Sequence, residues 1–226
     1  MVNKLVITID GPGGAGKSTV SKALASRLAY LYLDTGAYYR AYAYQAKQEN
    51  ISPADDEQLA ALGQRIKINA ENRDGNFHIF VDEADVTEKI RTEEIGLLAS
   101  TISARPCVRK ALLDIQRKVG AHGGIVAEGR DMGTVVFPGA DFKFYLDAAT
   151  SERAKRRYKE LAVKGAEGDF EKVVHALAAR DKQDSEREIA PLMPARDAYI
   201  IDSTHMTVWE VVNKMAELIS GHEQTE

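Results

Sequence analysis

One short stretch near the start of the chain has the residue types and spacing of a phosphate-binding loop. Gly11-Pro12-Gly13-Gly14-Ala15-Gly16-Lys17-Ser18 fits the pattern Gly, four variable residues, Gly, Lys, then Ser or Thr. Glycines in such a loop let backbone N–H groups turn toward phosphate oxygens, and the N-terminus of a following helix adds partial positive charge. We expect Lys17 to reach the β- and γ-phosphates of a nucleoside triphosphate and the Ser18 hydroxyl to hold Mg²⁺.

The loop predicts a bound nucleotide but does not by itself predict an enzyme. GTP-dependent switches share the loop, and they usually carry Asn-Lys-x-Asp to read guanine. Asn213-Lys214-Met215-Ala216 lacks the final Asp and falls in an amphipathic pattern. Residues 142–147 have the form of a strand that ends in a metal-binding Asp, and a core strand followed by a helix cap is an equal alternative. A glycine turn without a ligand is disfavoured, because spacing, flanks and position all agree with the phosphate loop.

Two groups of charged residues further along the chain have helical spacing. Arg180, Asp184 and Arg187 are separated by four and three residues, which predicts one shared helix face. The base precedes the acid, and this order supports a helix less well than the reverse, so a purely structural ion-pair stripe is slightly disfavoured. A second group, Arg153, Arg156 and Arg157, follows a predicted strand, and by itself such a basic face is usually only solvated.

The elements expected to position these residues alternate between strand and helix. Short runs rich in β-branched and apolar residues predict strands near 5–9, 31–34, 125–128, 142–146 and 198–202. Helices are expected near 17–30, 37–47, 55–66, 92–103, 106–120, 150–163, 169–188 and 207–220. Residues 65–69 and 76–81 alternate like antiparallel strands around a turn at 74–76, so 63–90 reads as an insert. Strands separated by helices predict an α/β fold with a parallel sheet covered on both faces.

Bulk composition excludes several classes of protein. The chain has 226 residues, of which 44% are hydrophobic and 28% charged, and this is ordinary for a globular protein. A net charge of −4 disfavours a general nucleic-acid binder. Cys107 is the lone cysteine, so no intrachain disulfide can form, which suits a reducing cytosol. We also expect no signal peptide and no membrane span, because no apolar run reaches 18 residues.

Beyond the loop, the chain resembles the bacterial cytidylate kinases over nearly its full length. The longest matching piece is residues 128–138, and within it Gly129-Arg130-Asp131-Met132-Gly133-Thr134 is highly specific to that family. The other matching pieces are residues 9–12, 34–40, 90–92, 180–187 and 201–204, and the insert at 63–90 also looks like a family feature. Some family members have Gly after the loop lysine, whereas this chain has Ser18, which strengthens the expected metal role.

The resemblance implies transfer of the γ-phosphate of ATP to CMP, and to dCMP, with Mg²⁺ as the cofactor. It implies that ATP is bound by Gly11, Pro12, Gly13, Gly14, Ala15, Gly16, Lys17, Ser18 and Thr19. It implies that CMP is bound by Thr35, Arg40, Ser100, Arg109, Arg130, Asp131, Arg180, Asp184 and Arg187. The catalytic residues it implies are Lys17, Arg130, Arg153 and Arg157, with Arg153 and Arg157 on a lid. Two roles remain open for Glu128: it could orient a magnesium-bound water, or it could cap a turn.

The implied roles agree with the chemistry of the side chains. The planar guanidinium of arginine suits the dianionic phosphate of CMP, and this role falls to Arg40 and Arg130 with Arg187 nearby. A carboxylate accepts from the cytosine amino group, which suits Asp131, with Ser100 and Arg109 on the rest of the base edge. Uracil would face Asp131 with a carbonyl, so UMP should be the poorer substrate.

The expected fold is therefore a P-loop α/β domain with strand order 2-3-1-4-5. The core would comprise 1–34, 106–147 and 166–226, the acceptor lobe 35–105, and the lid 148–165. We expect a cytoplasmic monomer that binds neither nucleic acid nor membrane. Two alternatives stay open: a kinase for another small acceptor such as UMP, AMP or shikimate, and a nucleotide-binding switch module.

Overall fold

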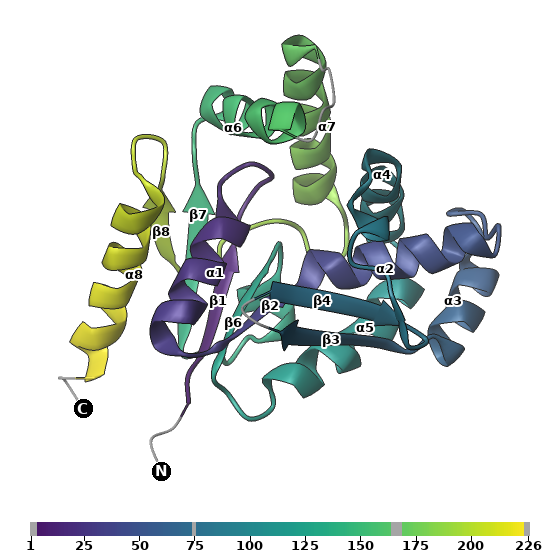
Figure 1. The fold of residues 1–226 in the computed structure, drawn as a ribbon, viewed down its shortest axis with the longest axis horizontal. Helices are drawn as coiled ribbons and strands as arrows, with labels where there is room; N and C mark the ends of the chain where they lie inside the picture. The colour runs from purple at the N-terminus through teal and green to yellow at the C-terminus, as the bar shows by residue number, and fades with distance from the viewer. Residues whose placement is uncertain (1–3, 74–75, 164–168, 224–226) are drawn as a thin grey trace.

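Five parallel strands form the central sheet of the chain. The computed structural model describes residues 4–73, 76–163 and 169–223. The strands are β1 (Val6–Asp10), β2 (Leu31–Asp34), β6 (Ile125–Gly129), β7 (Phe142–Asp147) and β8 (Tyr199–Asp202). Their spatial order is β2-β6-β1-β7-β8, which confirms the predicted order 2-3-1-4-5 (Figure 1). Since the strands are parallel, their carboxyl ends meet at one edge of the sheet, where ligands of such folds bind.

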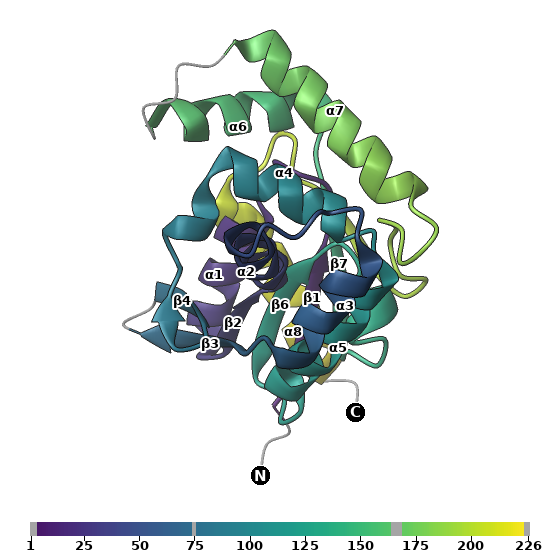
Figure 2. The ribbon, with the colours of Figure 1, turned by 90° about the vertical axis from the view of Figure 1, so that its right-hand side faces the viewer.

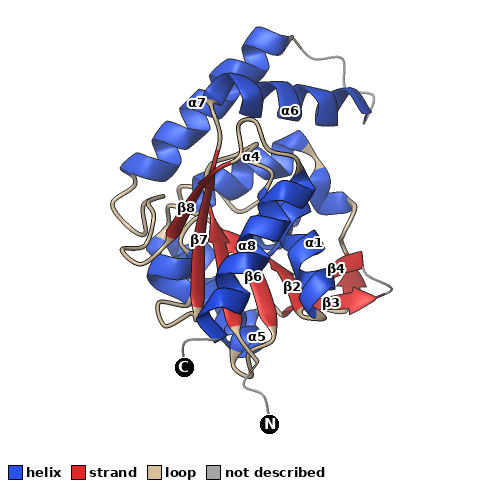
Figure 3. Cartoon of the chain, turned by 90° about the vertical axis from the view of Figure 1, so that its left-hand side faces the viewer, coloured by secondary structure: helices blue, strands red, loops and turns tan. Residues whose placement is uncertain are grey.

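Helices flank the strands and exclude water from them. Ile7 and Ile9 of β1 are fully buried, as expected of a central parallel strand that is covered on both faces. Helix α1 (Lys17–Leu28) packs against α8 (Val208–Glu223), and Figure 3 shows this pair in front of the sheet. The burial of both strand faces makes the sheet a rigid platform for the loops at its carboxyl edge.

The chain between β2 and β6 forms a helical lobe beside the sheet (Figure 2). It contains α2 (Thr35–Gln48), α3 (Asp56–Arg65), the short 3₁₀ helix η1 (Lys89–Arg91), α4 (Glu93–Ile102) and α5 (Pro106–Gly120). The helix starts are fixed by side chains that accept a backbone N–H. Asp34 accepts from Ala37 and Thr92 accepts from Ile95, while Pro106 occupies the first turn of α5 as predicted.

A small antiparallel sheet covers the outer side of β2. It consists of β3 (Ile68–Arg73), β4 (Asn76–Val81) and β5 (Ala84–Asp85), and most of the turn predicted at 74–76 lies outside the described residues. Asn72 Nδ2 donates to the Tyr32 carbonyl at 3.1 Å, and the Phe77 ring meets the Tyr32 ring edge-on at 5.6 Å. These contacts join the insert to the core sheet.

Two helices lie above the loop that links β1 to α1 (Figures 1 and 2). They are α6 (Thr150–Val163) and α7 (Phe170–Glu186), and they share a small apolar cluster of Ala154, Val173 and Leu177. The prediction that Arg187 shares a helix face with Arg180 and Asp184 is wrong. Arg187 has a ψ of 140° and leaves the helix, and the Leu192 N–H then bonds back to the Asp184 carbonyl at 2.7 Å.

No helix in the described part of the chain is long and apolar enough to cross a membrane.

Candidate active site

The loop between β1 and α1 packs so closely against its neighbours that two of its positions have no room for a Cβ. Gly11 has a φ of +147°, and a Cβ there would stand 2.0 Å from the Leu146 carbonyl oxygen. Gly14 has a φ of +76°, and its Cβ would stand 2.8 Å from the Arg153 carbonyl oxygen. Gly11 is the first glycine of the pattern read from the sequence, whereas Gly14 stands at one of its variable positions, where the structure nevertheless requires a glycine.

Lys17 lies at the start of α1 with its side chain folded across the loop. It is 6% exposed, and its Nζ donates to the Pro12 carbonyl at 2.7 Å. Burial, together with the positive charge of Arg130, lowers the pKa of Lys17, and the carboxylate of Glu128 partly offsets this. A buried ammonium under such electrostatic stress is stabilised by an added anion, so the loop is suited to a polyphosphate.

Two of the three arginines on α6 brace the loop from above. Arg153 donates to the carbonyls of Gly13 and Ala148 at 3.0 and 2.9 Å and to Asp181 Oδ2 at 2.5 Å. Arg156 donates to the Ala15 carbonyl at 3.2 Å. Arg157 is different, because among the described residues its guanidinium meets only the exposed Glu160, at 3.0 Å from Nη1.

Arg156 was not among the residues predicted for the site. It also donates from Nη1 to Ser203 Oγ at 3.1 Å and from Nη2 to the Ser203 carbonyl at 2.6 Å, while Ser203 Oγ reaches the Ala15 carbonyl at 3.2 Å. Helical spacing marked Arg156 as a neighbour of the other two arginines, but spacing carries no information about a contact with a residue 47 positions away.

A cluster of arginines lies beside the loop. Arg130 Nε donates to Asp184 Oδ2 at 2.8 Å, and a Cβ built on Gly13 would stand 3.8 Å from Arg130 Nη2. Arg180 has one ion-pair partner within the described residues, again Asp184, at 4.0 Å. The charge of Arg130, followed by burial, lowers the pKa of Arg180 to about 10, with further contributions from Arg40 and Arg157. Although burial alone would raise the pKa of Asp184, Arg130 and Arg180 pull it below its ordinary value.

Arg40 lies on the acceptor-lobe side of this cluster. Its Nη2 pairs with Asp34 Oδ2 at 2.8 Å, and the same Asp34 caps α2. One carboxylate therefore both starts the helix and orients the arginine that projects from it. The cluster as a whole carries more positive than negative charge, which favours a dianion such as phosphate.

Asp131 is held in a buried pocket of basic side chains. Its Oδ2 accepts from Arg109 Nη2, and its Oδ1 lies 3.7 Å from Arg187 Nη2. Arg187 Nη2 is buried and has no hydrogen-bond partner among the described residues. Burial raises the pKa of Asp131 despite the charges of Arg109 and Arg187. The Asp131 carboxylate, an acceptor, therefore lies beside the Arg187 Nη2 group, a donor without a hydrogen-bond partner among the described residues. A ligand that has both donors and acceptors could bond to both groups.

Arg109 and Ser100, both predicted to bind the cytosine edge with Asp131, have different surroundings. Arg109 joins Asp131 directly, rests over the Tyr39 ring at 5.7 Å, and donates to the Ser103 carbonyl at 3.2 Å. Ser100 contacts neither of them, and instead donates to Gln183 Oε1 of α7 at 3.4 Å. The role of Ser100 on the base edge therefore stays a prediction, and the sequence gave no sign of its bond to α7.

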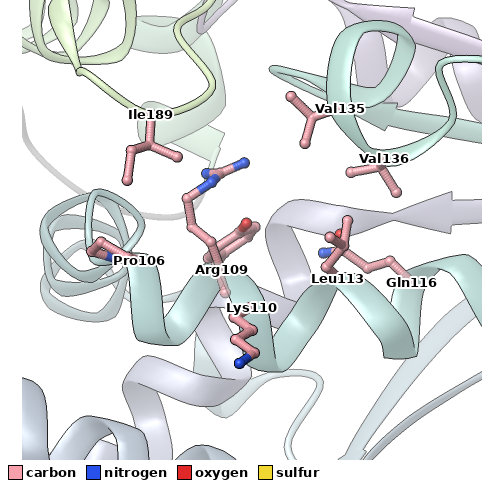
Figure 4. Close-up of a pocket in the computed structure, with 9 residues that line it drawn as sticks. Pro106, Arg109, Lys110, Leu113, Gln116, Val135, Val136 and Ile189 are labelled. Atoms are coloured by element: carbon pink, nitrogen blue, oxygen red, sulfur yellow. The ribbon is translucent and has the colours of Figure 1, made fainter.

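A pocket of about 200 Å³ adjoins Arg109. Figure 4 shows the Arg109 side chain rising from α5 between Ile189 and Val135. Apolar side chains dominate its lining, with Leu113, Val136 and Ile189 among them. The arginine that pairs with Asp131 thus borders a mainly apolar cavity on one side.

Oxygen donors gather where β2 and β6 end. Tyr32 Oη donates to Glu128 Oε1, Thr35 Oγ1 donates to the Glu128 carbonyl at 2.6 Å, and Ser18 is an electrostatic neighbour of Glu128. Burial, with the charge of Asp34 in the adjacent strand, raises the pKa of Glu128. Ser18 and Thr19 are exposed. Within the described ranges no three His, Cys, Asp or Glu side chains form a metal site. The Ser18 hydroxyl and the Glu128 carboxylate are hard oxygen ligands, which fit Mg²⁺ with several of its waters retained.

Asp10 is a buried residue that sequence reasoning did not use. It is the last residue of β1, and its two carboxylate oxygens accept the N–H groups of Met132 and Gly133, each at 2.8 Å. These two residues begin a short π-helical segment, η2 (Met132–Val136), that directly follows Arg130 and Asp131. An acid at the end of an apolar strand was visible in the sequence, but its partners lie about 120 positions away.

Comparisons with known proteins agree with this geometry. A family model described as cytidylate kinase matches residues 7–221. A cytidylate kinase from Citrifermentans bemidjiense is 50% identical over 96% of this chain and 93% of its own length. One from Bacillus subtilis is 45% identical over 97% of this chain and 98% of its own. A solved gluconokinase from Sinorhizobium meliloti 1021 covers 99% of this chain and 98% of its own at 13% identity with a TM-score of 0.50, which bears on the fold alone.

Proposed function

Because the chain belongs to the cytidylate kinase family and transfers the γ-phosphate of ATP to CMP, we propose that three adjacent groups of its side chains divide this reaction. The first is the phosphate loop, residues 11–19, which binds ATP. The second is the arginine cluster, defined as Arg40, Arg130, Arg180 and Arg187 with Asp184. The third is the base-reading pair, Asp131 and Arg109.

The observation that carries the assignment is the excess of positive charge beside the phosphate loop. Arg130 lies close to Gly13, and the pKa of Arg180 falls to about 10 chiefly because Arg130 is so near. A dianionic phosphate placed among these arginines relieves their mutual repulsion. The CMP phosphate then lies beside the γ-phosphate held by the loop, as direct transfer between two bound nucleotides requires.

In the transfer step, an oxygen of the CMP phosphate attacks the γ-phosphorus while the bond from that phosphorus to the β-phosphate oxygen breaks. Lys17 and Arg130 neutralise charge on the moving group. Arg157, whose hydrogen-bond partner in the described ranges is the exposed Glu160, reaches that group when the lid closes. Ser18, with Glu128 beside it, would hold Mg²⁺, which when bound screens the triphosphate charge. No covalent intermediate with the protein is needed.

The base-reading pair explains the preference for cytosine. Asp131 accepts from the cytosine amino group, while Arg109 and Ser100 serve the remaining edge. Asp184 and Arg180 bind the ribose, and dCMP is accepted as well. Arg187, whose buried Nη2 has no hydrogen-bond partner in the described part of the chain, supplies a donor to the nucleotide.

Closure of the acceptor lobe (35–105) and the lid (148–165) onto the core (1–34, 106–147 and 166–226) would exclude water from the transfer. Both substrate sites are built from one chain, which supports a monomer. The lone thiol, Cys107, fits a reducing cytoplasm.

A coupled assay of ADP release tests the function. The acceptor panel is CMP, dCMP, UMP, AMP, shikimate and no acceptor, each with Mg²⁺ and ATP. CMP and dCMP should give the highest kcat/KM, with UMP lower. A leading rate with UMP or AMP overturns the CMP assignment, and ATP binding without acceptor-dependent ADP release favours the switch module.

A further inference from the structure

Asp10 carries a buried charge that the transfer step does not use. It is 4% exposed and stands between the last apolar residue of β1 and Gly11, the first residue of the phosphate loop. Its carboxylate accepts two backbone N–H groups, from Met132 and Gly133, at 2.8 Å each. The main-chain register pairs Asp10 with Gly129, the residue before Arg130. One side chain thus joins the start of the donor loop to the segment that presents Arg130 and Asp131.

The η2 turn needs the acceptor that Asp10 provides, because the side chain at its own N-cap position, Asp131, is bonded elsewhere. Met132–Val136 forms η2, and the residue in its cap position is Asp131, whose side chain makes no capping hydrogen bond. That carboxylate faces Arg109 and Arg187 instead. The first N–H groups of a helical turn are costly to bury without an acceptor, and Asp10 supplies the acceptor from a neighbouring strand.

The carboxylate is retained at a cost to the fold. Burial raises the pKa of Asp10 to about 6, although the two N–H groups and, more weakly, Lys17 act in the opposite direction. A buried carboxylate lowers the stability of the fold unless its hydrogen bonds offset the cost of desolvation, which an apolar residue would not have to meet. Two oxygens that accept two adjacent N–H groups fix both the position and the rotation of the turn that follows Asp131.

We propose that Asp10 is a positioning residue for base selection, which holds Asp131 and Arg130 in register with the phosphate loop. The inference rests on the proposed function, since it assigns to Asp131 the reading of cytosine. Loss of Asp10 lets the turn after Asp131 rotate, so that the base-reading carboxylate no longer meets the cytosine amino group squarely. CMP then loses its advantage over UMP, while the phosphate loop still binds ATP.

The test is Asp10→Asn, which keeps the shape of the side chain but replaces one acceptor with an NH₂ that faces an N–H donor. The matched control is Asp141→Asn. Asp141 Oδ2 accepts from the Val6 N–H at 2.7 Å, so it bonds the same strand at the end remote from the site. For Asp10→Asn we expect the ratio of kcat/KM for CMP over UMP to fall at least tenfold, with the Kd of an ATP analogue changed less than threefold. The control should leave both quantities unchanged.

Of two further measurements, the first separates positioning from a merely structural role and the second tests the hydrogen bonds of Asp10. In an Asp131→Ala background, Asp10→Asn should not lower the CMP-to-UMP ratio further, because the residue it positions is gone. In the wild-type enzyme, NMR-detected exchange should find the amide hydrogens of Met132 and Gly133 slow, and this readout does not depend on any variant folding.

Different results overturn different statements. Equal loss of kcat/KM for CMP and UMP in Asp10→Asn, or fast exchange at both wild-type amides, overturns the role of Asp10 and leaves the kinase assignment intact. A wild-type enzyme that releases ADP without regard to CMP overturns the proposed function and the inference with it.

Discussion

Arg130 Nε and Asp184 Oδ2 lie 2.8 Å apart, and this bond joins the turn after β6 to helix α7, 54 positions further along the chain. The bond occupies one edge of the guanidinium. Nη1 reaches the Gly129 carbonyl at 3.3 Å, and Nη2 faces the phosphate loop near Gly13. Arg130 is therefore oriented by two neighbours, which would reduce the entropy lost if it binds a phosphate as proposed.

Replacing Arg130 by lysine tests this geometry. An ammonium is a single point of charge that cannot bond Asp184 and a phosphate in a fork, so Arg130→Lys should lower kcat/KM for CMP by about 10²–10³-fold. The Kd of an ATP analogue should change little. Arg117→Lys is the control, since Arg117 also donates to backbone carbonyls, those of Val135 and Val136, but lies outside the arginine cluster. Equal kinetic losses in the two variants would contradict the assignment.

Removing the Tyr32 hydroxyl tests the magnesium site. Tyr32→Phe keeps the ring against Phe77 and leaves Glu128 without the donor that orients it. The Mg²⁺ concentration for half-maximal activity should rise about tenfold, as for other partners that orient metal-facing groups. Tyr42→Phe removes another buried tyrosine hydroxyl, one that donates to the Leu59 carbonyl, and should not change the Mg²⁺ requirement. A Mg²⁺ titration of both variants decides the matter.

Binding of ATP should be accompanied by proton uptake at Lys17. Burial and Arg130 lower the pKa of Lys17 in the free protein, and the phosphates of ATP raise it again. The uptake should be larger at pH 8 than at pH 6, because at the lower pH the ammonium is already protonated before ATP arrives. Calorimetry in buffers of different ionisation enthalpy measures it. Lys17→Arg stays charged throughout, so uptake of the same size in that variant would assign the proton to another group.

The two lid arginines predicted to be catalytic should behave differently when truncated. Arg153 is buried and donates to three backbone or carboxylate groups, so Arg153→Ala should cost about 3 kcal/mol in the free energy of unfolding as well as activity. Arg157 is only partly buried, and its one ion-pair partner among the described residues is the exposed Glu160, so Arg157→Ala should lower kcat about tenfold or more without a change in Tm. Thermal unfolding beside steady-state kinetics separates the two, and a matching fall in Tm for Arg157→Ala would count against its role.

Asp10 should make the stability of the protein depend on pH in a known direction. Its pKa is raised from 3.8 to about 6 in the folded protein, so between these values the folded state binds more protons than the unfolded state. This contribution is favourable near pH 4 and is lost as the pH rises through 6, by at most about 3 kcal/mol. Relative to Asp10→Asn, the wild-type protein should therefore be more stable at pH 4 than at pH 7. Urea unfolding at both values checks the sign, and an opposite trend would show that the N–H groups outweigh burial.

Local pattern was sufficient to predict most of the fold. Short runs of β-branched and apolar residues predicted every strand of the main sheet, and Pro106 marked a helix start that the structure confirms. The helix boundaries were predicted less accurately, because the first and last residues of a helix depend on the conformation or side chain of a single residue. Helix α1 ends at Leu28 and not near residue 30, since Ala29 adopts a left-handed φ of 53° and its N–H turns back to Ser26. Helix α2 begins at Thr35 and not at residue 37, because Asp34 caps it.

The site was less predictable than the fold, because its contacts join distant parts of the chain. The phosphate loop was readable from eight consecutive residues. The bonds of Asp10 to Met132, of Arg156 to Ser203 and of Tyr32 to Glu128 span from 47 to 122 positions, and no local pattern encodes such pairs. The i, i+4, i+7 spacing predicted that Arg187 shares a helix face with Arg180 and Asp184. This prediction is wrong, because helix α7 ends at Glu186.

The small sheet that covers β2 also closes one edge of the main sheet. β2 is a terminal strand of the main sheet, and Leu31 at its start is already half exposed. Asn72 satisfies the Tyr32 carbonyl and Phe77 shields its ring, so the edge is closed to a strand from another molecule. A shortened chain without residues 63–90 would present a bare β-edge and should precipitate through edge-to-edge pairing, whatever remained of its catalytic power.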